Sequence, residues 1–225
     1  MNTAQTTDNN KKGNTIALAG MAVMILMTLT KIVPSSTIAG YSIFVGLAFF
    51  FITEAVTKTK GDASGLRFNT VIADLKKPRM ILWVLLPCVS GIGMTLIGSL
   101  IFGSAYTEHL MGRVGAVLSM ESIATTAIQV IIAAFGEEIA YRGFFFGKSS
   151  KMFPVWVCAL VSSAVFAAGH IAAGNIGIVV CDIASVFIDS LLFSAVYYKS
   201  GNCVVSTVSH IIANALVLVS VILFF

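Results

Sequence analysis

The chain has 225 residues, of which 57% are hydrophobic and only 11% are charged, and its mean hydropathy is +0.95. A soluble domain carries about 25% charged residues, so this composition argues against a fold surrounded by water. The net charge of +4 indicates membrane orientation rather than nucleic-acid binding, because basic residues collect in cytoplasmic loops.

The chain opens with a polar segment, residues 1–14, which we expect to be disordered. Seven apolar stretches follow, each long enough to cross about 30 Å of hydrocarbon, with six or eight spans as alternatives. These stretches are residues 16–33, 38–56, 80–103, 122–146, 155–173, 176–198 and 204–225. The predicted fold class is all-α, a polytopic bundle with an intramembrane cavity. We divide it into N-terminal membrane helices, residues 15–120, and a C-terminal core, residues 121–225.

The loop at residues 58–79 joins the second and third spans and is basic. Within it, residues 65–79 combine basic side chains with five apolar ones, which are Leu66, Phe68, Val71, Ile72 and Leu75. This pattern is typical of a helix that lies on a membrane surface and contacts anionic lipid.

Basic residues are distributed unevenly between the two sides of the predicted bundle. Twelve of the 14 Lys and Arg lie on the side of the N-terminus, and only Lys31 and Arg113 lie on the other. The positive-inside rule therefore predicts a multi-pass plasma-membrane protein whose N-terminus is cytoplasmic and whose C-terminus is outside.

The four cysteines lie within apolar stretches and form no CxxC pair. We therefore expect buried free thiols rather than disulfides or a zinc knuckle.

The densest group of intramembrane charges lies in the fourth span. An ionisable side chain costs at least about 2 kcal/mol in hydrocarbon, so each one needs an explanation. Glu138 and Arg142 are spaced i,i+4, which predicts an ion pair on one helix face. Glu137 lies about 100° further round the helix and is left without that partner. The alternative is that all three form a purely structural network.

Two of the three histidines also lie inside predicted spans. His170 is in the fifth span, and His210 is in the seventh, where Asn214 follows one turn later on the same face. Counted from the neighbouring turns at 1.5 Å per residue, Glu137, His170 and His210 lie at similar depths. We therefore expect these side chains to converge on one cavity.

A carboxylate beside an imidazole can activate a water molecule. A second imidazole and an amide could stabilise the oxyanion formed when that water attacks an amide bond. Zinc is an alternative, because two His and two Glu could also bind it. The chain lacks an HExxH motif, which favours the metal-free reading.

Three motifs occur in order on successive predicted helices: EExxxR at Glu137 to Arg142, FxxxH at Phe166 to His170, and HxxxN at His210 to Asn214. In these motifs, over residues 133–215, the sequence resembles the CAAX protease and bacteriocin-processing family, also called Abi. This family of intramembrane glutamic proteases includes the type II CAAX prenyl endopeptidases.

The resemblance implies a role for each matching residue and requires no metal cofactor. Glu137 with His170 would activate the water, and His210 with Asn214 would stabilise the oxyanion. Supporting positions would be Glu138, Arg142 and Phe166.

The resemblance also implies an endopeptidase that cleaves a peptide or lipidated-protein substrate in the bilayer. In bacteria such proteins take part in maturing a bacteriocin or signalling peptide, as in quorum sensing, or in self-immunity. The alternative is a non-catalytic scaffold or immunity protein acting on a sensor kinase or bacteriocin. The small size and the lack of a eukaryotic targeting signal favour a bacterial plasma membrane, and no nucleic-acid partner is expected.

Asp182, Ser185 and Asp189 form a polar stripe along the sixth span, at i, i+3 and i+7. They could pair with Arg142 or a backbone donor, or line a water-filled entry. Two acids on one face also fit a proton or cation pathway, which would make the protein a small transporter.

Overall fold

The computed structural model describes residues 3–32, 38–59, 64–116 and 122–224, and its regular elements are all helical. In chain order they are α1 (Thr3–Leu29), η1 (Thr30–Ile32), η2 (Ile38–Tyr41), α2 (Ser42–Thr57), α3 (Val71–Leu75), α4 (Met80–Phe102), α5 (Ser104–Gly115), α6 (Ile123–Glu137), η4 (Glu138–Phe146), α7 (Gly147–Ser149), α8 (Val155–Gly169), α9 (Ile176–Ser200) and α10 (Cys203–Phe224). The predicted all-α class is confirmed.

Five helical runs are long and apolar enough to cross a membrane. They lie in α1, α4, the continuous run from α6 to α7, α9 and α10. The other two predicted spans form the shorter apolar helices α2 and α8, of 16 and 15 residues. Large apolar side chains cover the outside of the bundle, with Leu100 77% and Ile176 82% exposed. This surface suits lipid, so the prediction of a polytopic membrane bundle is confirmed.

Two features of the N-terminal half differ from expectation. The polar tail is helical from Thr3 onward and continues into the first span, with a surface ion pair of 2.7 Å between Lys12 and Asp8. Helix α5 occupies a stretch that we expected to be a loop. The expected boundary between residues 120 and 121 lies outside the described residues.

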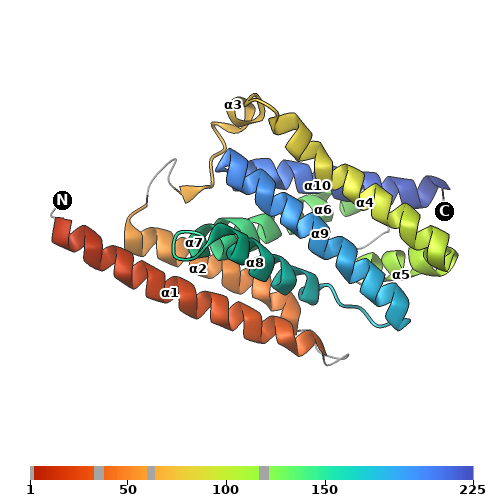
Figure 1. Cartoon of the computed structure of the whole chain (residues 1–225), viewed down its shortest axis with the longest axis horizontal. Coiled ribbons are helices and arrows are strands. Elements are labelled where there is room, and N and C mark those ends of the chain that lie inside the picture. Colours follow the sequence, from red (N-terminus) through yellow and green to blue (C-terminus); the bar gives the residue numbers. More distant parts are fainter. Residues whose placement is uncertain (1–2, 33–37, 60–63, 117–121, 225) are drawn as a thin grey trace.

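All nine residues of η4 are buried, and the other helices surround this segment (Figure 1). Helix α1 packs along α2, and α2 packs against η4. Helix α9 contacts α4, α8 and α10. The close approach of α2 to η4 depends on Gly46, because a Cβ there would lie 2.6 Å from the Cβ of Ala140. The segment with the twin Glu is thus held on several sides by other helices.

Several basic segments lie at the same end of the bundle as the N-terminus, and the C-terminus lies at the opposite end (Figure 1). Arg67, in the loop before α3, donates to the carbonyl of Ser200 at the end of α9, at 3.0 Å. Lys148 in α7 forms an ion pair with Glu54 near the end of α2. These contacts bring together basic segments that the sequence assigned to one side.

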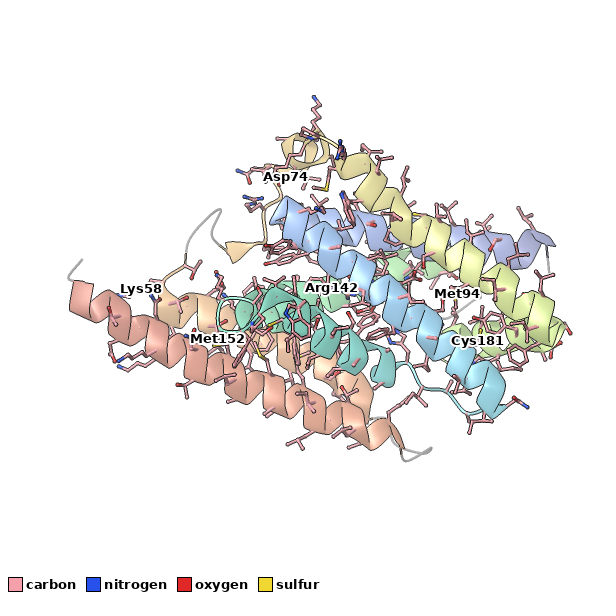
Figure 2. All side chains as sticks on the ribbon, in the orientation of Figure 1. Lys58, Asp74, Met94, Arg142, Met152 and Cys181 are labelled. Atoms are coloured by element: carbon pink, nitrogen blue, oxygen red, sulfur yellow. The ribbon has the colours of Figure 1, made fainter. Side chains whose placement is uncertain are left out.

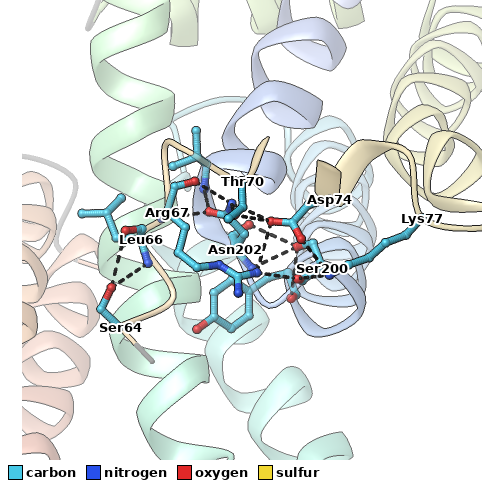
Figure 3. Close-up of polar contacts among 10 residues, drawn as sticks. Ser64, Leu66, Arg67, Thr70, Asp74, Lys77, Ser200 and Asn202 are labelled. Carbon is cyan, nitrogen blue, oxygen red and sulfur yellow. Dashed lines mark hydrogen bonds and ion pairs between the residues drawn. The ribbon is translucent and has the colours of Figure 1, made fainter. Parts of the chain in front are cut away.

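The expected interfacial segment forms only the five-residue helix α3, which is fixed to the turn between α9 and α10 by a polar cluster around Asp74 (Figure 3). The buried Asp74 carboxylate accepts hydrogen bonds from Thr70 at 2.8 Å and Asn202 at 3.0 Å. It also pairs with Lys77 at 2.7 Å and Arg67 at 3.1 Å. We call these five residues the Asp74 cluster.

The other members of the Asp74 cluster stabilise the ionised form of the Asp74 carboxylate. Burial acts to raise the pKa of Asp74, but the hydrogen bonds from Lys77, Asn202 and Thr70 and the charge of Arg67 outweigh it. Together they lower the pKa from 3.8 to about 2. The carboxylate therefore stays ionised at neutral pH and ties the loop to α10.

Candidate active site

The site is built around a π-helix, η4, that begins at Glu138 and continues α6 without a break. Bonds between residues i and i+5 widen such a helix, and π segments recur at functional sites. The expected ion pair is present, with 3.0 Å between Arg142 Nη1 and Glu138 Oε1. Both side chains are almost fully buried, at 1% and 0% exposure. Glu138 is therefore the structural member of the twin.

Arg142 lies near the middle of the bundle and joins η4 to two other helices (Figure 2). It donates to the backbone carbonyl of Ser190 in α9 at 3.2 Å and to its hydroxyl at 2.8 Å. Its guanidinium also lies 4.6 Å from the ring centroid of Phe166 in α8 and 5.3 Å from that of Phe193 in α9. Cation–π contacts in a desolvated setting add to the ion pair, so Arg142 fixes the relative positions of three helices.

His210 in α10 is held in one orientation. Its Nδ1 lies 2.9 Å from Glu138 Oε1, and its ring stacks on Phe193 with centroids 4.4 Å apart. A carboxylate only accepts hydrogen bonds, so Nδ1 carries the proton. The other ring nitrogen, Nε2, then lies 3.7 Å from Glu137 Oε2.

His170 is the C-terminal cap of α8, which ends four residues earlier than its predicted span. Its Nδ1 donates to the carbonyl of Phe166 at 2.8 Å, one of the carbonyls that a helix end leaves unpaired. Because a carbonyl can only accept, Nε2 of the neutral ring holds the lone pair. That atom lies 4.0 Å from Glu137 Oε1.

Glu137 thus lies between the two histidines, each at one of its carboxylate oxygens. The separation of 4.0 Å from His170 is too long for a direct hydrogen bond. A water oxygen about 2.8 Å from both atoms would subtend an angle of about 90° across this gap, near the angle between the two hydrogens of water. Both atoms are acceptors, so the water would donate a hydrogen to each. The side chains of Glu137 and His170 are 15% and 25% exposed, which leaves the site accessible.

Asn214 follows His210 by one turn of α10 and is exposed. The structure therefore leaves its amide accessible, but unlike the two histidines it is not joined to the twin Glu by any contact that the described residues show. Its role in binding an oxyanion stays a prediction.

The polar stripe on α9 is divided between two surroundings. Of the alternatives considered for the stripe, pairing of Asp182 with Arg142 is wrong, because Asp182 is bound by Arg113 at 2.9 Å and His109 at 3.2 Å, both from α5. Asp189 instead faces α4, where a Cβ on Gly91 would lie 3.4 Å from its Oδ2. The reason for the error is that α5 was taken as a loop, so Arg113 and His109 were not considered as partners.

Sequence reasoning also missed Ser190 and Phe193, the two α9 residues that contact Arg142. Phe193 is one of 16 phenylalanines, and nothing local distinguishes it from a core residue. Ser190 had a usable signal, because it is a polar residue next to Asp189 in an apolar span and an intramembrane Arg needs partners.

No group of three or more His, Cys, Asp or Glu side chains in the described part of the chain is placed to bind a metal ion. The four cysteines are free, and all but Cys181 are fully buried.

Comparison with known proteins bears on the segment that holds this site. A family model described as Type II CAAX prenyl endopeptidase Rce1-like matches residues 118–216, which include the twin Glu and both intramembrane histidines. Searches of curated proteins and of solved structures found no match. The matched family is one of CAAX-type proteases, as the resemblance implied. Residues 118–216 of this chain are therefore similar to the type II CAAX prenyl endopeptidase Rce1-like family.

Proposed function

We propose that the protein is an intramembrane endopeptidase that hydrolyses a peptide bond with a water molecule held between Glu137 and His170. The observation that carries this proposal is the gap of 4.0 Å between Glu137 Oε1 and His170 Nε2. Both atoms accept hydrogen bonds, so a water in the gap would turn an oxygen lone pair toward a substrate carbonyl.

In the proposed reaction the water oxygen attacks the carbonyl carbon, and Glu137 takes the proton that the water loses. The carbonyl oxygen becomes an oxyanion, which His210 and Asn214 would stabilise. Nδ1 of His210 already donates to Glu138, so only the doubly protonated ring could donate from Nε2. Glu137 then passes its proton to the leaving nitrogen as the carbon–nitrogen bond breaks, which returns the carboxylate to its starting state.

The substrate we propose is a peptide or lipidated protein whose cleaved bond reaches into the cytoplasmic half of the bilayer. The family match supports a prenylated substrate ending in a CAAX sequence as the first probe. The distribution of Lys and Arg supports a plasma-membrane location with the N-terminus inside. A role in bacteriocin or signalling-peptide maturation, or in self-immunity, is the biological setting that we propose.

The test is cleavage of a farnesylated CAAX peptide by the purified chain in lipid nanodiscs, followed by mass spectrometry. We expect release of the C-terminal tripeptide, and loss of that release in Glu137→Ala and in His170→Ala. Activity should persist after treatment with a metal chelator, because the proposed mechanism uses no metal. Correct insertion of each variant is checked by its elution volume and helical circular dichroism.

Full activity in Glu137→Ala would contradict the proposed mechanism, which needs this carboxylate to accept the proton of the water. A cellular phenotype that survives alanine at both Glu137 and His170 would instead support the scaffold or immunity alternative.

A further inference from the structure

A cavity of about 470 Å³ lies where α3 meets α4, away from the candidate active site. Its apolar wall includes Ile72 on α3 and Ile81 and Leu82 on α4. These side chains are 70%, 53% and 63% exposed. The wall would be costly to leave in water, since apolar area contributes about 25 cal/mol per Å² when it is buried.

The rim of this cavity is basic. Lys76, Lys77 and Arg79 all line it. Lys77 is already engaged, because it pairs with Asp74 at 2.7 Å and donates to the carbonyl of Ser200 at 2.9 Å. Lys76 and Arg79 are exposed, and none of the ion pairs among the described residues includes them.

Arg79 also adopts a backbone conformation that is unfavourable for its residue type. Its φ is +61°, in the left-handed region where Gly or Asn would be less strained. The side chain of Arg79 lines the rim of the cavity.

The cavity lies at the level of the membrane surface. Helix α4 begins at Met80 and is long and apolar enough to cross a bilayer, so the residues just before it reach the headgroups. Trp83 lies one turn into α4, and Nζ of Lys199 lies 4.4 Å from the centroid of its ring. Tryptophan is typical of the interface between membrane and water. Both features are typical of residues at the level of the lipid headgroups.

We propose that this cavity binds one anionic phospholipid. Lys76 and Arg79 contact the headgroup phosphate, and the apolar wall receives the upper part of an acyl chain. Free phosphate would match the rim but would leave the exposed wall uncovered, whereas a phospholipid satisfies both surfaces. The Asp74 cluster holds α3 in place, so the cavity is formed before the lipid arrives.

The test is native mass spectrometry of the purified full chain in detergent, titrated with dioleoyl phosphatidylglycerol. We expect tighter binding than for dioleoyl phosphatidylcholine. The variant Lys76→Ala with Arg79→Ala should weaken phosphatidylglycerol binding about 25-fold, because each basic residue near an anionic surface contributes about fivefold. Both residues are exposed, so the variant is expected to fold.

The matched control changes two other lysines beside an apolar cleft. Lys11→Ala with Lys12→Ala alters a second depression, lined also by Ile16 and Val56, and should leave phosphatidylglycerol binding unchanged. An equal loss in this control would show that net charge alone attracts the lipid and would overturn the site.

Two further results would also contradict the proposal. One is unaltered phosphatidylglycerol binding in the Lys76 and Arg79 double variant. The other is displacement of the lipid by millimolar inorganic phosphate, which would identify a simple anion site. The variant Ile72→Asn distinguishes a phospholipid site from a site for free phosphate, because it should weaken lipid binding and leave any phosphate binding unchanged.

Discussion

The carboxylates of Asp74 and Glu137 are surrounded in opposite ways. Asp74 has four partners between 2.7 and 3.1 Å, including two cations. Glu137 has His210 at 3.7 Å and His170 at 4.0 Å, both beyond a normal hydrogen bond. The Asp74 carboxylate is fully engaged in contacts that hold the fold together. The Glu137 carboxylate has room for a small molecule between itself and the His170 imidazole.

This difference separates a structural network from the site that we propose to be catalytic. Its clearest form lies within the twin Glu itself, because Glu138 is fully buried and paired with Arg142 and His210. Fixed partners around Glu138 hold the π-helix, whereas Glu137 has only the two longer contacts with His210 and His170. Substituting Glu137 should therefore reduce activity, whereas substituting the structural ion-pair partners should reduce stability.

The largest expected effect is on activity, in Glu137→Gln. This change removes the proton acceptor and keeps the shape, so cleavage should fall by about 10³-fold or more. Because Glu137 has no short contact to lose, the melting temperature should hardly change. Glu108→Gln, on an exposed acid of α5, is the matched control and should keep full activity. Full activity in Glu137→Gln would contradict the role of Glu137 as the proton acceptor.

The next effect is on stability, in Arg142→Ala. Removing one partner of a buried ion pair typically costs about 3–5 kcal/mol, because the other charge stays buried without compensation. Thermal unfolding in detergent measures this cost. Adding Glu138→Gln to the same chain should recover part of it, since the uncompensated charge is then gone. A double variant no more stable than the single one would argue that packing of the guanidinium on Phe166 and Phe193 dominates.

A smaller effect is expected in Asp74→Asn, and it depends on pH. A carboxyl whose pKa is lowered by folding stabilises the native state above its unfolded pKa and loses that contribution as pH falls through the folded value. The change from 3.8 to about 2 corresponds to about 2 kcal/mol. This contribution is present at pH 7 and disappears between about pH 4 and pH 2.

Melting temperatures of native protein and Asp74→Asn should therefore differ at pH 7 and converge at the lower end of that range. Asp8→Asn serves as the control, because the pair of Asp8 with Lys12 is exposed and surface pairs contribute about 0–1 kcal/mol. Equal effects of the two substitutions at pH 7 would contradict the assignment of Asp74 as a buried anchor.

The central features of this fold and site could be predicted from local pattern. Apolar runs identified the helices, and counting residues from the turns placed Glu137, His170 and His210 at one depth. These inferences succeeded because helix rise is constant and intramembrane charges are rare.

Features that depend on tertiary contacts could not be predicted in this way. Helix α5 is short and polar, so it resembled a loop, and Arg113 was consequently missed as the partner of Asp182. The π-helix has no simple periodic signal, and Phe193 is recognisable only once α9 is packed beside Arg142. Packing between helices distant in sequence determines all three.

The measurement that tests the central claim most directly is a double-mutant cycle on cleavage by Glu137→Gln, His170→Asn and the combined variant. If Glu137 and His170 hold one shared water, the second substitution removes nothing that the first has not already removed. We therefore predict that the combined variant is no slower than the slower single variant. Losses that multiply would show that the two side chains act independently and would contradict the account.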